Sequence, residues 1–210
     1  GHPMCAKVSA EVMARAKHVL GENRQRPARV NFRGYAVSEE HKKRMASLPA
    51  HLQIPREQWE SHPNFSGRFF MCNFHWDFRT ELQTCIETLW SGVQDPGSVT
   101  PGLLKKASDE WGIFQAHLQK HVYIEENHIF PAIQPRYPNI NLSHLYQDHR
   151  DIFEAENRVA TAFRSSADPV EVCADALEAV VKFDEYFMDH LGEEEEFITP
   201  LTLYPEVKCY

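Results

Sequence analysis

The chain has 210 residues, of which 42% are hydrophobic, so it is long enough for one domain with a substantial core. The formal net charge is −8, and the acidic excess lies after residue 60, which argues against nucleic acid as a partner. No run of 18 apolar residues occurs, so no membrane partner and no membrane-spanning helix are predicted.

Residues 1–64 are predicted to form a partly helical N-terminal extension that packs on the rest of the chain. Ser9 to Gly21 has a helical apolar stripe and ends on a typical stop residue. Residues 25–37 have no helical period, whereas Ser38 to Pro49 and Pro55 to Ser61 predict short helices. Because the extension has too few apolar residues to fold alone, we expect it to lie over the main body. Its basic residues make binding of a protein partner a further hypothesis.

Residues 65–210 are predicted to form the main domain, which contains four long amphipathic segments. Their apolar residues recur every three or four positions, as in helices that pack into a bundle. The segments are residues 65–90, 103–131, 142–164 and 170–201. Short loops favour antiparallel neighbours, so we predict an all-α, antiparallel up-down-up-down four-helix bundle.

The spacing His-x-x-x-Glu occurs twice, in HVYIEENHIFP from His121 and in HLGEEEEFITP from His190. Positions i and i+4 of a helix lie on one face, about 6 Å apart. His121 with Glu125, and His190 with Glu194, can therefore bind the same centre. A buried carboxylate without a partner costs several kcal/mol, and a cation offsets that cost.

The apolar stripes of the other two long segments carry one histidine each, His75 and His149. A lone histidine on such a stripe is usually a core residue, and a lone His/Glu pair is usually a surface ion pair worth ~0.3 kcal/mol. A doubled pair with matching histidines on the other two helices is harder to explain without a metal. The predicted metal ligands are His75, His121, Glu125, His149, His190 and Glu194.

The ligand types restrict the metal. Imidazole and carboxylate without thiolate fit iron, manganese or zinc, and six ligands exceed the four of a single zinc ion. We therefore predict two metal ions bridged by carboxylates, with iron favoured and zinc or manganese as substitutes. The five cysteines never form a Cys-x-x-Cys pair, which argues against a disulfide framework and favours a cytoplasmic location.

These motifs, together with FHWDFR around His75 and YQDHRDIF around His149, resemble the hemerythrin-like, or HHE cation-binding, family over roughly residues 65–204. The resemblance implies two non-haem irons bridged by two carboxylates and an oxo or hydroxo group. It implies that His75 and His121 bind one iron, that His149 and His190 bind the other, and that Glu125 and Glu194 bind both.

The resemblance also implies a function: binding of O2 or a related small ligand for transport, storage or sensing. Other family members act on peroxide or nitric oxide, so a di-iron oxidase or a peroxide- or nitric-oxide-consuming enzyme is an alternative. An iron-dependent regulatory module, with the N-terminal extension recruiting a partner, is a third hypothesis.

The chain departs from the respiratory hemerythrins at the third long segment, where that group has a His-x-x-x-His pair. Here Leu145 and Phe153 stand four residues before and after His149, so one histidine ligand is missing. An open metal position would favour activation of O2 or peroxide, or sensing. The groups weighed as a replacement, without a choice among them, are His117, Tyr146, Glu156 and Tyr186.

Two acidic features have weaker interpretations. Glu125 and His128 have the Glu-x-x-His spacing of ferritin-like di-iron sites, but that architecture needs a second copy, which the chain lacks. Apart from Glu194, the run Glu193 to Glu196 is predicted to be a solvated face.

Overall fold

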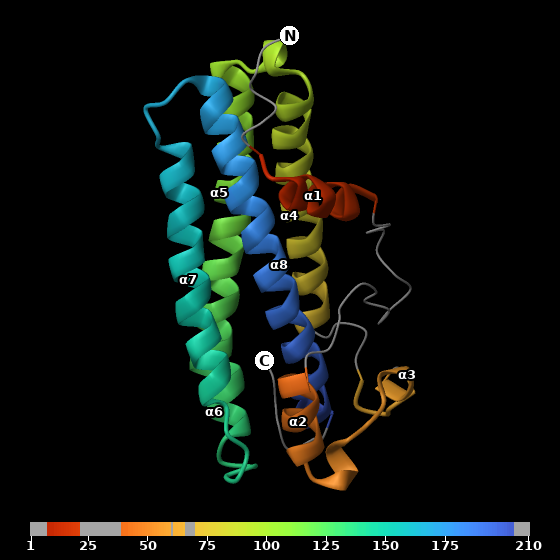
Figure 1. Cartoon of the computed structure of the whole chain (residues 1–210). Helices are drawn as coiled ribbons and strands as arrows, with labels where there is room; N and C mark the ends of the chain where they lie inside the picture. The colour runs from red at the N-terminus through yellow and green to blue at the C-terminus, as the bar shows by residue number, and fades with distance from the viewer. Residues whose placement is uncertain (1–7, 22–38, 60, 66–69, 204–210) are drawn as a thin grey trace. The chain divides into compact units, whose positions relative to one another are not determined.

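The computed structural model describes residues 8–21, 39–59, 61–65 and 70–203. Their regular structure is entirely helical, with no strand among them, which confirms the predicted all-α class. The four predicted long helices are present (Figure 1). They are α4 (Phe70–Gln94), α5 (Pro101–Ile124), α7 (Ser143–Phe163) and α8 (Pro169–Thr202).

Shorter helical elements precede and interrupt these four. They are α1 (Ala10–Gly21), α2 (Glu39–Ser47), η2 (Ala50–Leu52), α3 (Arg56–Trp59), η3 (Pro96–Ser98), a π-helical turn η4 (Glu125–Ile129) and α6 (Phe130–Ile133). The short helices predicted in the N-terminal extension are therefore present. The irregular segment predicted at residues 25–37 lies outside the described residues.

Local side-chain chemistry sets where the long helices begin. The hydroxyl of Thr100 accepts a hydrogen bond from the backbone N–H of Leu103 at 3.2 Å, just before α5. Asp168 accepts one from the N–H of Val170 at 3.0 Å, at the start of α8. A polar residue of this kind satisfies a backbone donor that the first helical turn leaves without an intrahelical partner.

Helix α4 ends later than the sequence predicts, because Gly92 continues the helix. A Cβ atom added to Gly92 would lie 2.7 Å from the sulfur of Cys173 on α8. The glycine therefore permits close packing of two helices, and it does not act as a helix stop.

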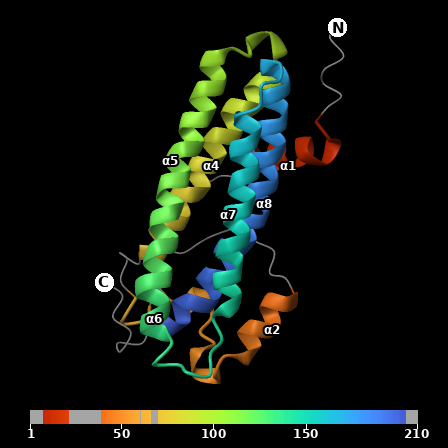
Figure 2. The same ribbon diagram turned by 90° about the vertical axis from the view of Figure 1, so that its left-hand side faces the viewer.

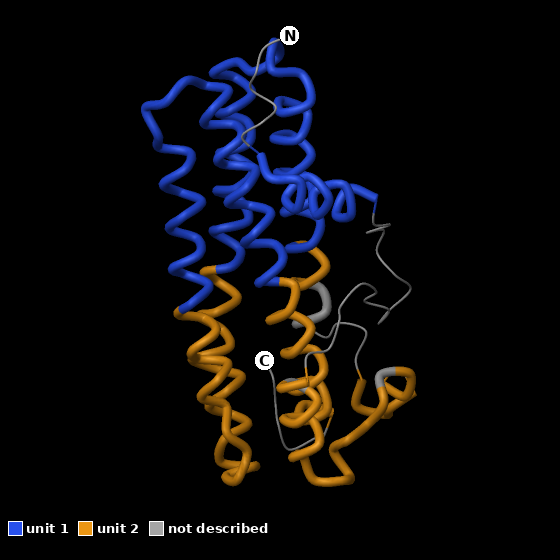
Figure 3. The backbone as a smooth tube through the Cα atoms, in the orientation of Figure 1, with its two compact units in different colours: residues 1–23, 78–118, 151–187 blue, residues 24–77, 119–150, 188–210 orange. Residues whose placement is uncertain are grey.

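The chain divides into two compact units (Figure 3). Unit 1 comprises residues 1–23, 78–118 and 151–187, and unit 2 comprises residues 24–77, 119–150 and 188–210. Each unit thus contains a part of every long helix, and the helices of the N-terminal extension are divided between the units. The up-down-up-down order over the full helix lengths, and the domain boundary at residues 64 and 65, stay predictions.

Unit 1 has an aromatic core. Within it the segments of α4, α5, α7 and α8 run side by side (Figure 2). Phe114 contacts Phe78, Phe183 and Phe187 with ring centroids 5.4 to 5.6 Å apart. The helix α1 is joined to α8 by an ion pair between Arg15 and Asp184 at 3.0 Å.

Unit 2 has an aliphatic and aromatic core in which the N-terminal extension participates. Its buried members come from η2 and the residues around it, from the segment after Glu125, from the start of α7 and from the end of α8. They are Leu48, Leu52, Ile129, Phe130, Ile133, Ile140, Leu142, Leu145, Phe197, Ile198 and Leu201. Among the described residues, no helix combines the length and apolar character that crossing a bilayer requires.

Truncation of Phe114 should test the aromatic core. Phe114→Ala removes a ring with 0% exposure, so we expect the free energy of unfolding to fall by about 3–5 kcal/mol in chemical denaturation. The matched control is Ile113→Ala at the neighbouring, 55% exposed position, which should change that free energy by less than about 0.5 kcal/mol. Equal losses in the two variants would contradict the assignment of the core.

Candidate metal centre

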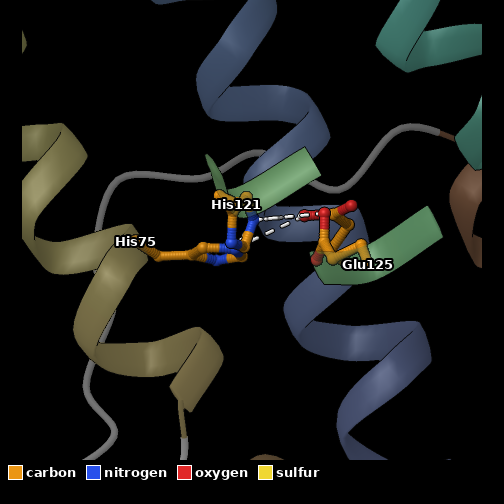
Figure 4. A group of neighbouring side chains, drawn as sticks. His75, His121 and Glu125 are labelled. Atoms are coloured by element: carbon orange, nitrogen blue, oxygen red, sulfur yellow. Dashed lines mark hydrogen bonds and ion pairs between the residues drawn. The ribbon is translucent and has the colours of Figure 1, made fainter. Parts of the chain in front are cut away.

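The structure brings the six predicted ligands together inside unit 2. Each of the six is at most 4% exposed. Figure 4 shows His75 on α4 and His121 on α5 pointing toward the carboxylate of Glu125. His149 extends from α7, and His190 and Glu194 extend from α8. Their role as metal ligands stays a prediction, but their convergence in a water-excluded place is a fact of the fold.

The six side chains form two donor sets that share one carboxylate. One set is His75, His121, Glu125 and Glu194, and the other is His149, His190 and Glu194. Within each set, the donor atoms lie within 4.8 Å of one another. Such spacing is short enough for one cation to contact every member of a set, and Glu194 belongs to both sets.

Distances inside the cluster show that Glu194 is its centre. One of its oxygens, Oε1, lies 3.1 Å from Nε2 of His190 and 3.3 Å from Nε2 of His149. The other, Oε2, lies 3.3 Å from Nε2 of His75 and 3.7 Å from Nε2 of His121. All four imidazoles therefore present the same nitrogen, Nε2, to the cluster.

The opposite nitrogen of three imidazoles faces another carboxylate. Nδ1 of His75 lies 2.9 Å from Glu195, and Nδ1 of His149 lies 2.8 Å from Glu126. Nδ1 of His190 lies 3.5 Å from Asp148. An ionised carboxylate only accepts hydrogen bonds, so when the rings of His75 and His149 are neutral, these contacts keep the hydrogen on Nδ1 and leave the Nε2 lone pair for a metal. This arrangement fixes ring orientation and increases ligand basicity in metal sites.

Two buried glutamates in the run Glu193 to Glu196 were missed by the sequence prediction. The prediction that Glu193 and Glu195 belong to a solvated face is wrong, because they are 7% and 0% exposed. Consecutive helical residues point about 100° apart, so a run of four glutamates cannot share one face. This helical geometry alone predicts that at least one of the four glutamates faces the interior.

His128, which follows Glu125 with the Glu-x-x-His spacing, is exposed.

A π-helical turn carries Glu125. Residues 125–129 form this wider turn, in which the N–H of Phe130 bonds to the carbonyl of Glu125. Pro131 follows, and a proline within a helix lacks an N–H and clashes with the carbonyl four residues earlier. Widening the helix before Pro131 relieves that clash, and π-helical turns recur at functional sites. Here the two consecutive carboxylates Glu125 and Glu126 both approach the ring of His149.

Neither donor set includes any of the groups weighed as a replacement for the missing histidine. His117 pairs with Glu81 at 2.6 Å in unit 1. Glu156 and Tyr186 also belong to unit 1, whereas all six donors belong to unit 2. Tyr146 lies in unit 2 and packs edge to face on Phe130, with ring centroids 5.1 Å apart. Leu145 is fully buried in the unit 2 core and has no donor atom to offer.

The electrostatics of the cluster favour bound positive charge. Burial alone would lower the pKa of His75, His149 and His190, but the neighbouring carboxylates outweigh it. Contacts with Glu125 and Glu194 raise the pKa of His149 to about 11, and Glu194 and Asp148 raise that of His190 to about 9. The pKa of His75 is raised by Glu194 and Glu195. Burial would raise the pKa of Glu194, yet the surrounding imidazoles hold it well below its usual value.

Comparison with known proteins identifies a family. A model of the hemerythrin HHE cation binding domain matches residues 70–202. This range includes all six predicted ligands and the four long helices. Searches among curated proteins and among solved structures gave no match.

The raised histidine pKa values predict that cations displace protons. A histidine must be neutral to bind a metal, so each protonated imidazole must release its proton on binding. We expect apparent cation affinity to rise as the pH increases from 6 to 9. Calorimetry in two buffers of different ionisation enthalpy should show proton release at pH 7. Binding heats that do not depend on the buffer would contradict this prediction.

The same shifts predict how the metal-free protein responds to pH. A histidine whose pKa is raised by folding stabilises the fold fully below the unfolded pKa of ~6.5, and this contribution is lost as the pH rises through the folded pKa. For His190 and His149 the loss should occur through about 9 and about 11. Urea titrations of chelator-treated protein should therefore show falling stability above pH 7, and a rise in stability would contradict the assignment.

Proposed function

Since the chain belongs to the hemerythrin HHE cation-binding family, we propose that its buried centre holds two iron ions and binds O2 or a related small ligand. The role of the protein would be oxygen binding, storage or sensing. A single observation carries the proposal: two donor sets from four helices share the carboxylate of Glu194. A shared carboxylate is what a dinuclear centre requires, and a single ion would leave donors of the other set unused.

The donor chemistry supports iron. Seven ligand positions, with Glu194 counted in both sets, comprise four imidazoles and three carboxylate contacts and no thiolate. Imidazole and carboxylate together suit iron, and manganese and zinc are the substitutes that the same donors accept. Bound iron would supply the electrons for reducing O2, which side chains of this kind cannot supply.

The protein's own residues would orient and protect the centre. Glu195 and Glu126 orient the rings of His75 and His149 through their Nδ1 atoms, and Asp148 lies 3.5 Å from Nδ1 of His190. Burial of the six donors keeps bulk water away from the metal positions. The free thiols of Cys85 and Cys173, both buried, support the cytoplasmic location expected from the sequence.

One observation favours an enzyme as the second candidate. The set on α7 and α8 has three donors, whereas the set with His75 and His121 has four. A metal with few protein donors can accept an external ligand and activate it. An oxidase, or an enzyme that consumes peroxide or nitric oxide, would use such a position. Recruitment of a protein partner by the N-terminal extension, as in an iron-dependent regulatory module, remains the third proposal.

Metal content tests the ligand assignment. Elemental analysis of freshly purified protein should give about two iron ions per chain. Glu194→Gln should reduce binding at both positions, because Glu194 belongs to both sets, and His121→Ala should affect mainly the first. His128→Ala, at an exposed residue of the same segment, is the matched control and should keep both ions. Unchanged metal content in Glu194→Gln would refute the assignment.

Optical spectroscopy distinguishes reversible O2 binding from an enzymatic reaction. Addition of O2 to the reduced, iron-loaded protein should produce a visible charge-transfer band. Loss of the band under vacuum and its return with O2 would support binding or storage. Irreversible decay of the band together with steady consumption of O2 or peroxide would support the enzyme. A protein that loads iron but shows no response to O2, peroxide or nitric oxide would contradict both.

A further inference from the structure

The segment 39–52, which contains α2 and η2, lies outside the range that the family comparison matches. It nevertheless belongs to the compact unit that contains all six donors. Leu48 and Leu52 are 3% and 0% exposed and share a core with residues that follow the two His-x-x-x-Glu motifs, such as Phe130 and Phe197. The segment is therefore an integral part of the protein around the donor cluster.

Arg44 connects this segment to α8 through a bidentate ion pair. Its Nε and Nη2 donate to the two carboxylate oxygens of Glu193, and the Nη2 to Oε2 distance is 2.6 Å. Glu193 is 7% exposed, and Nε2 of His144 lies 3.1 Å from it. On its outer side, Arg44 is 3.4 Å from Glu40. A planar guanidinium that binds both oxygens fixes the orientation of a carboxylate as well as its distance.

Glu193 stands next to Glu194, the carboxylate shared by both donor sets. Neighbouring residues on a helix keep a fixed rise and rotation, so the turn of α8 that carries Glu193 cannot rotate without moving Glu194. Without Arg44, the carboxylate of Glu193 would lose both hydrogen bonds from the guanidinium while it stays buried within a run of four glutamates. Breaking a buried ion pair in this way favours movement of the remaining carboxylate toward water.

We propose that Arg44 is a positioning residue for the cation centre. By holding Glu193, it keeps Glu194 directed at the four imidazoles, and the segment 39–52 thereby sets how slowly bound cations leave. The inference rests on the proposed cation-binding function and adds a part of the chain outside the matched domain to the site.

Unit 1 offers a matched control for the loss of an ion pair. Arg15 on α1 pairs with Asp184 on α8 at 3.0 Å. The side chains of this pair are 23% and 0% exposed, against 26% and 9% for Arg44 and Glu193. Both pairs thus join an N-terminal helix to α8 with similar burial. Only the Arg44 pair adjoins a predicted ligand in sequence.

The experiment measures release of iron from the full-length protein. Wild type, Arg44→Gln, Arg44→Lys and Arg15→Gln are loaded with Fe(II) without oxygen and mixed with excess chelator that forms a coloured Fe(II) complex. Residues that support metal ligands typically change affinity 10- to 100-fold, so Arg44→Gln should release iron about 10- to 100-fold faster than wild type. Arg44→Lys keeps the positive charge but loses the planar guanidinium that binds both oxygens of Glu193. Its rate of iron release should therefore lie between those of wild type and Arg44→Gln.

Arg15→Gln should release iron within about twofold of wild type, since it shares no partner with the donor cluster. Urea unfolding of the metal-free variants measures the stability lost by each. If Arg44→Gln and Arg15→Gln release iron equally fast, a general loss of stability explains the effect and the inference is overturned. A wild-type rate in Arg44→Gln overturns it as well. Should Arg44→Gln not fold, a wild-type rate in Arg44→Lys has the same meaning.

The outcome also separates this inference from the proposed function. Wild-type protein that takes up no cation contradicts the proposed function and the inference together. Wild-type protein that binds iron, with release unaffected by Arg44→Gln, contradicts the inference alone.

Discussion

The structure around the candidate centre depends on a carboxylate that has no access to water. Glu194 is 0% exposed, and the removal of a charge from water costs several kcal/mol unless a partner compensates. The compensation comes from imidazoles on four helices, which approach its two oxygens within 3.1 to 3.7 Å. Each of these helices must therefore present its histidine at a particular height and rotation. The electrostatic requirement of one side chain thus constrains all four helices in unit 2.

Three further carboxylates lie behind the imidazole rings and add negative charge around Glu194. Glu125 and Glu194 lie within the cluster, and Glu126, Asp148 and Glu195 lie behind the rings, so five carboxylates accompany four imidazoles. With neutral histidines the group carries excess negative charge in a place of low dielectric constant. Protons reduce this excess in the metal-free protein, and divalent cations reduce it more effectively. The same negative charge that raises the pKa values of His149 and His190 therefore favours the binding of cations.

Much of this centre can be predicted from the sequence, because its inner residues follow helical spacing. His121 with Glu125, and His190 with Glu194, lie one turn apart, and His75 and His149 lie on apolar stripes. The outer contacts do not follow spacing. Glu195 meets a histidine 120 positions away in the sequence, and Arg44 meets a glutamate 149 positions away. Such pairs depend on the rotation of packed helices, which hydrophobic periodicity does not specify.

The unequal donor sets bear on where a small ligand would bind. The set with His75 has four donors, and its outer carboxylate, Glu195, is fully buried. The set on α7 and α8 has three donors, and its outer carboxylates are more accessible, with side-chain exposures of 34% for Glu126 and 26% for Asp148. Because Leu145 offers no donor one turn before His149, an external ligand has fewer protein atoms to displace at this second set. Under the proposed function, a small ligand would therefore bind on the α7 and α8 side, and the four-donor side would retain its cation more tightly.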